Sequence, residues 1–188
     1  MSVKNKILSK IPSTTVTNLT NNFTQIKKFQ SSDVAANDRF GWSVAVSSNR
    51  IVVGVPYEDT TASDAGSAYI FDMNGNELAK IQASDAAGYD EFGNSVACSD
   101  TRIVVGAQYE DTTASDAGSA YIFDIDGNEL AKIQASDAGS GDRFGTAVAV
   151  SNSRIVVGAP YEDTAASNAG AVYAVSYTHL TLPTNREV

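Results

Sequence analysis

Short apolar runs alternate with polar loops along this chain, and the whole pattern returns every 52 residues. The clearest run is IVVG, which begins at residues 51, 103 and 155 and is followed two residues later by YEDT each time. A repeat of about fifty residues is typical of stacked arrays and propellers, in which one unit buries its apolar faces only against its neighbours. The period therefore predicts a repeat architecture.

Each unit carries four segments with the pattern of a β-strand. In the first unit these segments cover residues 42–48, 50–56, 66–72 and 77–84. The first alternates apolar with small residues, the second is apolar on both faces, and the fourth mixes lysine and glutamine with alanine and isoleucine. The first two patterns favour strands packed between neighbouring sheets, whereas the composition of the fourth suits a partly exposed outer strand.

Short polar turns separate these segments. Ser48-Asn49 lies between the first two, and Asn74-Gly75 or Asp126-Gly127 lies between the last two. Asn-Gly and Asp-Gly favour type I′ hairpin turns, because both central residues of that turn need positive φ. The flanking stretches DMNGNE (72–77) and DIDGNE (124–129) are interpreted as hairpin turns and not as calcium loops, since they lack the length and the distal glutamate of an EF-hand.

The predicted fold class is all-β, with propeller blades of four antiparallel strands and about three blades. Residues 26–33 lie one period before residues 78–85 and match their pattern, so they predict a lone outer strand, which in a closed propeller could complete the last blade. Because a ring takes about four to eight blades, we expect a truncated propeller or part of an open or assembled array. The predicted organisation is a flexible leader (1–22), a lone outer strand (23–33), blade 1 (34–85), blade 2 (86–137), an incomplete blade 3 (138–174) and an artefactual tail (175–188).

Composition narrows the classes of partner. The chain is 43% hydrophobic, only 19% charged, and has a formal net charge of −9. An acidic balance repels phosphate backbones and anionic lipid surfaces, which disfavours nucleic acid as a partner. No apolar run reaches the ~18 residues that a membrane span needs, and the first residues lack the apolar core of a cleavable signal peptide.

Three motifs recur in order in each unit, as DRFGWSVAVS, IVVGVP and AGSAYIFD in the first. With these motifs the chain resembles the FG-GAP repeat family, which forms the blades of integrin α-subunit propellers and of many bacterial and viral surface proteins. The resemblance covers residues 26–174 and implies a β-propeller used for adhesion or ligand binding, at an extracellular, virion or cell-surface location. The residues that give the family its name are Phe40-Gly41 with Gly54-Val55-Pro56, Phe92-Gly93 with Gly106-Ala107-Gln108, and Phe144-Gly145 with Gly158-Ala159-Pro160.

One family feature does not carry over. Many integrin blades hold calcium in a DxDxDG turn between the first and second strands, where carboxylates supply the oxygen ligands. Here that turn reads SSNR (47–50), SDTR (99–102) or SNSR (151–154), and Asp100 is its only carboxylate. The usual calcium site of the family is therefore not expected at this turn.

The chain has one cysteine and one histidine, the two residue types most often used in catalysis and metal binding. Cys98 is the only cysteine, and because Val46 and Val150 occupy its place in the other units we expect it to be a small core residue. His179 is the only histidine and lies in residues 175–188, which resemble translated sequencing-adapter sequence. A Ser-His or metal-His site is therefore not expected.

The acidic residues are the remaining candidates. In an up-and-down blade, the loop between the second and third strands and the loop to the next blade emerge on the same side, so 15 of the 22 acidic residues should share one rim. Arg39 and Arg143 are the only basic residues expected there, and Tyr57, Tyr109 and Tyr161 should lie at the same rim. The candidate ligand-binding residues are Glu58, Asp59, Asp64, Asp90, Glu91, Glu110, Asp111, Asp116, Asp142, Glu162 and Asp163.

These carboxylates allow more than one interpretation. They could bind Ca²⁺ and help to engage a carbohydrate or protein partner, or they could cap turns by accepting hydrogen bonds from their own backbone. Paired carboxylates also support glycoside hydrolysis, although identical acids in every unit favour repeated structure over one catalytic site. The sequence therefore predicts a non-enzymatic adhesion or ligand-binding module with calcium as its candidate cofactor. The alternatives are a purely structural surface or virion component and a glycan-active hydrolase.

Overall fold

The computed structural model describes residues 24–177, and these contain eleven β-strands and no helix. The chain divides after Gln30 into two compact units, and every strand belongs to the second. No described helix is long and apolar enough to cross a membrane. The strands are β1 (Ser43–Val46), β2 (Ile51–Val55), β3 (Ser67–Phe71), β4 (Glu77–Ile81), β5 (Ser95–Cys98), β6 (Ile103–Ala107), β7 (Ser119–Phe123), β8 (Glu129–Ile133), β9 (Ala147–Val150), β10 (Arg154–Ala159) and β11 (Ala171–Ser176).

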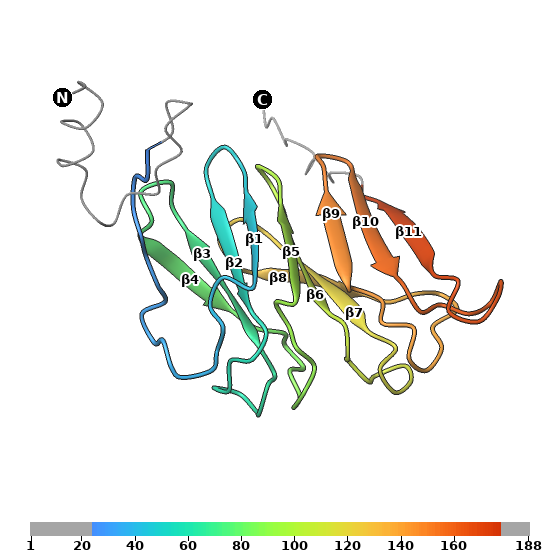
Figure 1. Cartoon of the computed structure of the whole chain (residues 1–188). Coiled ribbons are helices and arrows are strands. Elements are labelled where there is room, and N and C mark those ends of the chain that lie inside the picture. The colour runs from blue at the N-terminus through green and yellow to red at the C-terminus, as the bar shows by residue number, and fades with distance from the viewer. Residues whose placement is uncertain (1–23, 178–188) are drawn as a thin grey trace, which may run out of the picture. The chain divides into compact units, whose positions relative to one another are not determined.

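Consecutive strands pair antiparallel into three sheets, seen as three adjacent ribbons in Figure 1. Blade 1 contains β1 to β4 and blade 2 contains β5 to β8, each in sequence order. Blade 3 has only β9, β10 and β11 among the described residues. The prediction of an all-β, incomplete propeller of about three blades is confirmed.

The register of the blades repeats as closely as their sequence. Ile51 lies opposite Phe71 in blade 1, and Ile103 lies opposite Phe123 in blade 2. The pairing of the third with the fourth strand has the same irregularity in both blades, before Phe71 and before Phe123. An equivalent residue can therefore be compared directly between blades.

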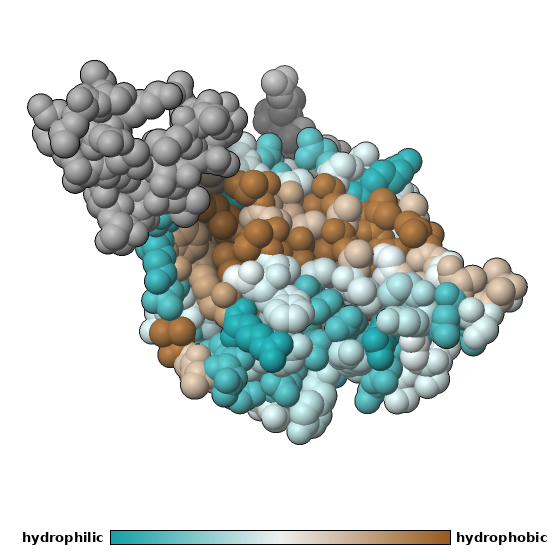
Figure 2. Space-filling model, viewed as in Figure 1, coloured by the Kyte–Doolittle hydropathy of each residue, from teal (hydrophilic) through white to brown (hydrophobic). Residues whose placement is uncertain are grey.

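The core lies between blades. One buried cluster combines Val52 and Ile70 of blade 1 with Ile103 and Phe123 of blade 2, and a second cluster joins blade 2 to blade 3 in the same way. Each blade thus buries apolar faces against its neighbours, as the period predicts. Figure 2 shows that apolar residues also gather at the surface, in a band across the strands that hydrophilic loops border.

The Phe-Gly pair is a contact point between successive blades. Phe92 is fully buried and packs edge-on against Tyr121 of its own blade, with ring centroids 5.4 Å apart. Its backbone forms a parallel bridge with Gly66 of blade 1, while Gly93 follows with φ of 94°. A Cβ on Gly54 would overlap the carbonyl oxygen of Gly93, so the two backbones approach too closely for any side chain.

The two outward faces of the array differ from the faces inside it. Val44 of β1 is 67% exposed, whereas its equivalent in blade 2, Val96, is 9% exposed because blade 1 covers it. On the opposite face Val172 of β11 is 72% exposed, although Ala120 at the same place in blade 2 is fully buried. The first strand of blade 1, expected to be packed between sheets, has one apolar face uncovered by the described residues.

Residues 24–33 are not a strand in this structure, in which β3 and β7 already pair with outer strands, so an outer strand that completes another blade stays a prediction. Two other local predictions were wrong. The turn after β3 has five residues, and only Gly75 has positive φ, so Asn74-Gly75 does not form a type I′ turn. Cys98 is half-buried, and it packs beside the core instead of inside it.

Two further predictions concern the ends of the chain. The predicted leader (1–22) and most of the predicted tail, including His179, lie outside the described residues. Strand β11 continues through Ser176 and thus past the predicted blade boundary at residue 174. The hydroxyl of Tyr177 donates to the carbonyl of Ser151 at 2.6 Å, so the chain still packs on blade 3 at that point.

Candidate functional site

Two loops of each junction form the predicted rim, at the lower edge of the blades in Figure 1. The loop after β2 and the loop after β4 are joined by backbone hydrogen bonds from Tyr89 to Ser63, at 2.8 Å, and from Glu91 to Asp64, at 3.1 Å. The equivalent bond from Arg143 to Asp116, at 3.1 Å, joins the next pair of loops. The two kinds of loop therefore lie on the same side, as expected.

Glu58 is a buried carboxylate at the centre of this rim in blade 1. It accepts hydrogen bonds from the Ser67 hydroxyl at 2.6 Å, the Gln82 amide at 3.2 Å, and both the backbone and the hydroxyl of Thr60. The bonds from Ser67 and Gln82 end on Oε2 of Glu58, and those from Thr60 end on Oε1. The ammonium of Lys80 also lies 2.9 Å from Oε1. Both carboxylate oxygens are thus engaged by the protein itself.

Glu110 repeats this arrangement in blade 2. It is 4% exposed and accepts from Ser119 at 2.6 Å and Gln134 at 3.2 Å, while Lys132 lies 2.8 Å away. Burial alone would raise the pKa of Glu110, but the bonds from Lys132, Ser119 and Thr112 hold that pKa below its ordinary value. The carboxylate is therefore charged and saturated near neutral pH.

The lysine also connects one blade to the preceding segment. Asp85 follows β4 of blade 1, yet its carboxylate accepts from the Tyr121 hydroxyl and the Lys132 ammonium of blade 2, both at 2.7 Å. Asp33 makes the same bonds to Tyr69 and Lys80 of blade 1. Burial disfavours the charged forms, but these contacts lower the pKa of Asp85 and raise that of Lys132.

The prediction that Arg39 and Arg143 are the only basic residues at the rim is wrong. Lys80 and Lys132 lie on the outer strands β4 and β8, but their long side chains reach the rim and place their ammonium groups among carboxylates. Lys80 and Lys132 occupy the same position of successive repeats, and this recurrence is the sequence feature that could have indicated a shared role.

Several aspartates of the rim loops accept hydrogen bonds from nearby backbone amides and so stabilise turns. The buried carboxylates of Asp90 and Asp142 accept from backbone amides three residues earlier, at 2.8 Å and 2.6 Å. Asp59 and Asp111 accept from the amides of Asp64 and Asp116. This geometry favours the capping interpretation for these residues. Burial, together with nearby Glu110 and Asp111, raises the pKa of Asp90 to about 6.

Blade 3 lacks most of this network. Glu162 is 5% exposed, yet among the described residues it accepts one hydrogen bond, from the amide of Thr164 at 2.7 Å. Ala171 stands where blade 1 has Ser67, and no described lysine or glutamine is present at the places of Lys132 and Gln134. Asp137 retains its bond from the Tyr173 hydroxyl, at 2.8 Å.

Tyrosine and arginine alternate along the rim. The Arg143 guanidinium lies 4.7 Å from the ring centres of both Tyr109 and Tyr161, at the junction of blades 2 and 3. Arg39 lies 4.3 Å from Tyr57, at the start of the array. At the junction of blades 1 and 2, Glu91 occupies the equivalent position and accepts a hydrogen bond from the Gln108 amide at 2.8 Å.

At this middle junction, where glutamate stands in place of arginine, the rim contains a notch of about 330 Å³. Tyr89 stands at its edge with 66% of its surface exposed. The notch is lined by Gly88, Tyr89, Glu91, Tyr109, Asp111 and Asp116. Among the predicted site residues, the structure therefore brings Glu91, Asp111 and Asp116 together around an open space.

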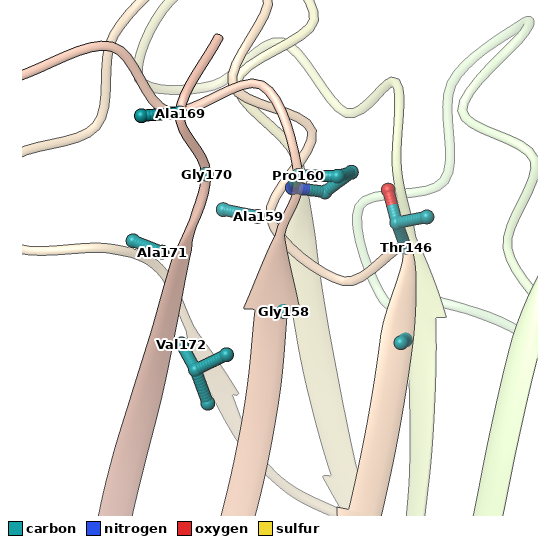
Figure 3. Close-up of a pocket in the computed structure, with 9 residues that line it drawn as sticks. Thr146, Gly158, Ala159, Pro160, Ala169, Gly170, Ala171 and Val172 are labelled. Carbon is teal, nitrogen blue, oxygen red and sulfur yellow. The ribbon is translucent and has the colours of Figure 1, made fainter. Parts of the chain in front are cut away.

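A second hollow, of about 450 Å³, lies on the outward side of blade 3 (Figure 3). Thr146, Pro160 and Val172 line it together with small residues of β9, β10 and β11, and Thr146 contributes the only side-chain hydroxyl. This hollow offers no group suited to catalysis.

The comparisons with known proteins agree with the repeat geometry. A family model for the FG-GAP repeat matches residues 23–71, 76–123 and 128–175. The chain belongs to the FG-GAP repeat family. No curated protein sequence matches it. FG-GAP repeats build β-propeller modules that are often involved in binding, are typical of extracellular or surface proteins, and are typically not enzymes.

The matched FG-GAP segments are offset from the blades. Each match begins with an outer-strand segment and ends at the third strand of the following blade, so the third combines β8 with β9, β10 and β11. Residues 23–33 are therefore the opening segment of the first repeat. Because of this offset, the first repeat begins with an outer-strand segment that precedes blade 1 and belongs to none of the three sheets. At the other end, blade 3 has no outer strand among the described residues.

Metal binding and hydrolysis require groups that are free to act. Within residues 24–177, no three His, Cys, Asp or Glu side chains gather in a way that could hold a metal ion. The pKa values of Asp90 and Glu110 shift in opposite directions, but both side chains are buried, and both oxygens of Glu110 accept hydrogen bonds from the protein.

Proposed function

We propose that this FG-GAP chain is a non-enzymatic binding module at a cell or virion surface, and that its middle notch receives a cationic side chain of a protein partner. The observation that carries the proposal is the contrast between neighbouring junctions. One junction holds Arg143 between two tyrosine rings, and the other has Glu91 in place of the arginine. A guanidinium or ammonium group from a partner would thus occupy a position that arginine fills elsewhere in the same rim.

The chemistry of the notch suits such a group. Glu91, Asp111 and Asp116 supply negative charge, and the face of Tyr109 supplies a cation–π partner worth about 0.5–2 kcal/mol. Carboxylates that accept two hydrogen bonds from one guanidinium bind it more strongly than neutral groups do. The net charge of −9 would also speed encounter with a basic surface.

Calcium and carbohydrate stay predictions from the sequence. Calcium would compete with a cationic side chain for the oxygens of Glu91, Asp111 and Asp116, and a sugar would use the exposed ring of Tyr89 instead. The structural alternative needs no occupant of the notch. These possibilities can be distinguished by adding an arginine analogue or calcium and measuring the response of the notch residues and of the melting temperature.

The test is a titration of N-acetyl-arginine methylamide into the full chain, followed by nuclear magnetic resonance of the notch residues. We expect saturable shifts at Tyr89 and Tyr109 that weaken at high salt, and at least tenfold weaker binding in Glu91→Arg, because that substitution fills the notch as Arg143 fills its neighbour. Asp163→Asn is the matched control, since it removes an exposed acid of blade 3 and should leave binding unchanged. Equal affinity of Glu91→Arg and the unaltered chain would refute the proposal.

Calcium is tested separately by thermal unfolding. A cation bound only by the folded state raises the melting temperature as its concentration rises. A rise at millimolar calcium that Glu91→Arg abolishes would assign the notch to calcium instead of a cationic side chain.

A further inference from the structure

We propose that copies of this chain assemble head to tail, with residues 24–41 and blade 1 of one copy completing blade 3 of another. The two ends of the array carry complementary halves of the junction that joins blades 1 and 2. Four separate features of that junction can be compared with the ends. Each has a half that the described residues of blade 3 leave unfilled, and a matching half in residues 24–41 or on blade 1. This interface uses no residue of the notch, so its test is independent of the proposed binding function.

The first feature is the socket for the Phe-Gly pair. Inside the array, a Cβ on Gly54 or Gly106 would overlap the carbonyl oxygen of the glycine that follows the next blade's phenylalanine. On blade 3, a Cβ on Gly158 would meet nothing nearer than the Ala147 side chain at 3.6 Å, because the socket is the apolar hollow of Figure 3. The matching group is Gly41, which has the same φ near 92° and no atom within 4 Å of its would-be Cβ.

The second feature is the edge of the sheet. In blades 1 and 2 the third strand pairs with the fourth, but no described strand pairs with the outer edge of β11. An unpaired edge is a template for another strand. Residues 24–30 carry the outer-strand pattern one period before β4 and are not a strand here. Transferring the register of blade 1 to blade 3 places Lys27 opposite Ala174 and Lys28 opposite Tyr173.

The third feature is the buried carboxylate Glu162. Its equivalents are neutralised by Lys80 and Lys132, whereas Glu162 has no described lysine. A buried charge without a partner is costly, so the site favours an incoming cation. In the transferred register Lys28 takes the place of Lys80, and Gln30 takes the place of Gln82.

The fourth feature is the pair of apolar faces. Val44 and Val46 of blade 1 are exposed, and so are Val156 and Val172 of blade 3. At the inner junctions the equivalent residues pack against the neighbouring blade. Stacking blade 1 of one copy on blade 3 of another would cover both faces at once, and burial of apolar surface drives association.

The occupant is a second copy and not the same chain. Asp33 of each chain is held by Tyr69 and Lys80 of its own blade 1, and blade 2 lies between that blade and blade 3. Closing the three described blades on themselves would make a ring below the range of about four to eight blades. Two copies closing on each other would make a ring of six blades, which lies within that range.

The decisive experiment is sedimentation velocity of the full chain over a wide concentration range. We expect a dimer at micromolar concentrations, and at least a tenfold weaker dimer for Lys28→Glu, because the substitution brings a second acid to Glu162. Glu162→Lys should weaken assembly likewise, and an equimolar mixture of the two variants should recover hetero-dimers through one unaltered interface. Because Glu162→Lys could disturb blade 3, Lys28→Glu stands alone as the test. A chain that stays monomeric at hundreds of micromolar, or a Lys28→Glu variant that dimerises as well as the unaltered chain, would overturn the proposal.

Disulfide trapping tests the register. In a Cys98→Ser background, Lys27→Cys with Ala174→Cys should give covalent dimers on oxidation, because the transferred register places these two residues directly opposite each other. Ile26→Cys with Ala174→Cys is the matched control, since position 26 is displaced from that partner and faces the other side of the strand. Equal cross-linking in both pairs would contradict the assigned register, and cross-linking within monomers only would contradict exchange between copies.

Discussion

Blades 2 and 3 share the IVVGA sequence of their second strand and the YEDT sequence that follows IVVG two residues later, but they have different surroundings. In blade 2, Glu110 is surrounded by Lys132, Ser119 and Gln134, and the glycine socket of β6 is filled by Gly145. In blade 3, Glu162 is equally buried with one described hydrogen bond, and its socket is open. The comparison teaches that a blade of this array is completed by elements that come from beyond its first three strands.

The largest expected effect concerns Lys132, which blade 2 has and for which the described part of blade 3 has no counterpart. Lys132→Met should lower the free energy of unfolding by about 3–5 kcal/mol, because it leaves Glu110 charged, buried and without its cation. Urea unfolding at neutral pH measures the loss, and Lys132→Arg should retain most of the stability.

The companion substitution in blade 3 should act in the opposite direction. Glu162→Gln should leave the stability of dilute protein unchanged or raise it by about 1 kcal/mol, since it removes a buried charge that has no described cation. A loss at Glu162→Gln as large as that at Lys132→Met would show that blade 3 has a cation near Glu162 after all.

Glycine substitutions sharpen the same contrast. Gly106→Ala should destabilise the chain by about 3 kcal/mol, because its Cβ would overlap the Gly145 carbonyl oxygen and force the blades apart. Gly158→Ala should change the stability of dilute protein by less than about 0.5 kcal/mol, since its socket is open. Thermal unfolding of both variants checks the pair, and similar losses would mean that the socket of blade 3 is filled.

Substitution of the aspartates that follow the outer strands, Asp85 and Asp137, should change the free energy of unfolding by amounts that differ less between the two blades. Asp85→Asn should cost about 1–2 kcal/mol, because Asp85 binds both Tyr121 and Lys132 across a junction. Asp137→Asn should cost about 0.5 kcal/mol, because Asp137 binds only the hydroxyl of Tyr173 among the described residues. Unfolding midpoints of the two variants in urea provide the measurement, and an inverted order would contradict the role assigned to the lysine.

The smallest expected effect is a pH dependence at Asp90. Burial raises the pKa of Asp90 to about 6, above its ordinary value of 3.8, so the folded chain binds a proton more tightly than the unfolded chain. Its contribution to stability is therefore present at low pH and is lost as pH rises from about 4 to about 6. Asp90→Asn should gain stability relative to the unaltered chain across that window, measured by unfolding at several pH values. A flat difference would contradict the raised pKa.

The sequence predicted the blades because period and alternation are set by local chemistry. The repeated IVVG run, the mixed outer strands and the shared side of the acidic loops all follow from spacing, and the structure agrees with them. The lysine network was not predictable in this way, since the reach of Lys80 across to Glu58 depends on where a long side chain turns. The exposed faces of β1 and β11 depend on which neighbours are present, and a repeat pattern treats every unit as an inner one.

Type I′ turns failed as a prediction for a related reason. Asn74-Gly75 is a strong dipeptide signal, but Asp72 accepts hydrogen bonds from the amides of Asn74 and Asn76 and thereby stabilises a longer turn. One polar side chain before the dipeptide was enough to change the loop.

Hydrogen exchange of the β11 amides, compared with those of β7 at increasing protein concentration, tests the central claim most directly. In dilute solution the amides of residues 171–176 should exchange faster than those of Ser119–Phe123, because a described strand pairs with only one edge of β11. As concentration rises, the β11 amides should become protected while the β7 amides stay unchanged. Protection of β11 equal to that of β7 at every concentration would contradict the claim that blade 3 is completed from outside its own described strands.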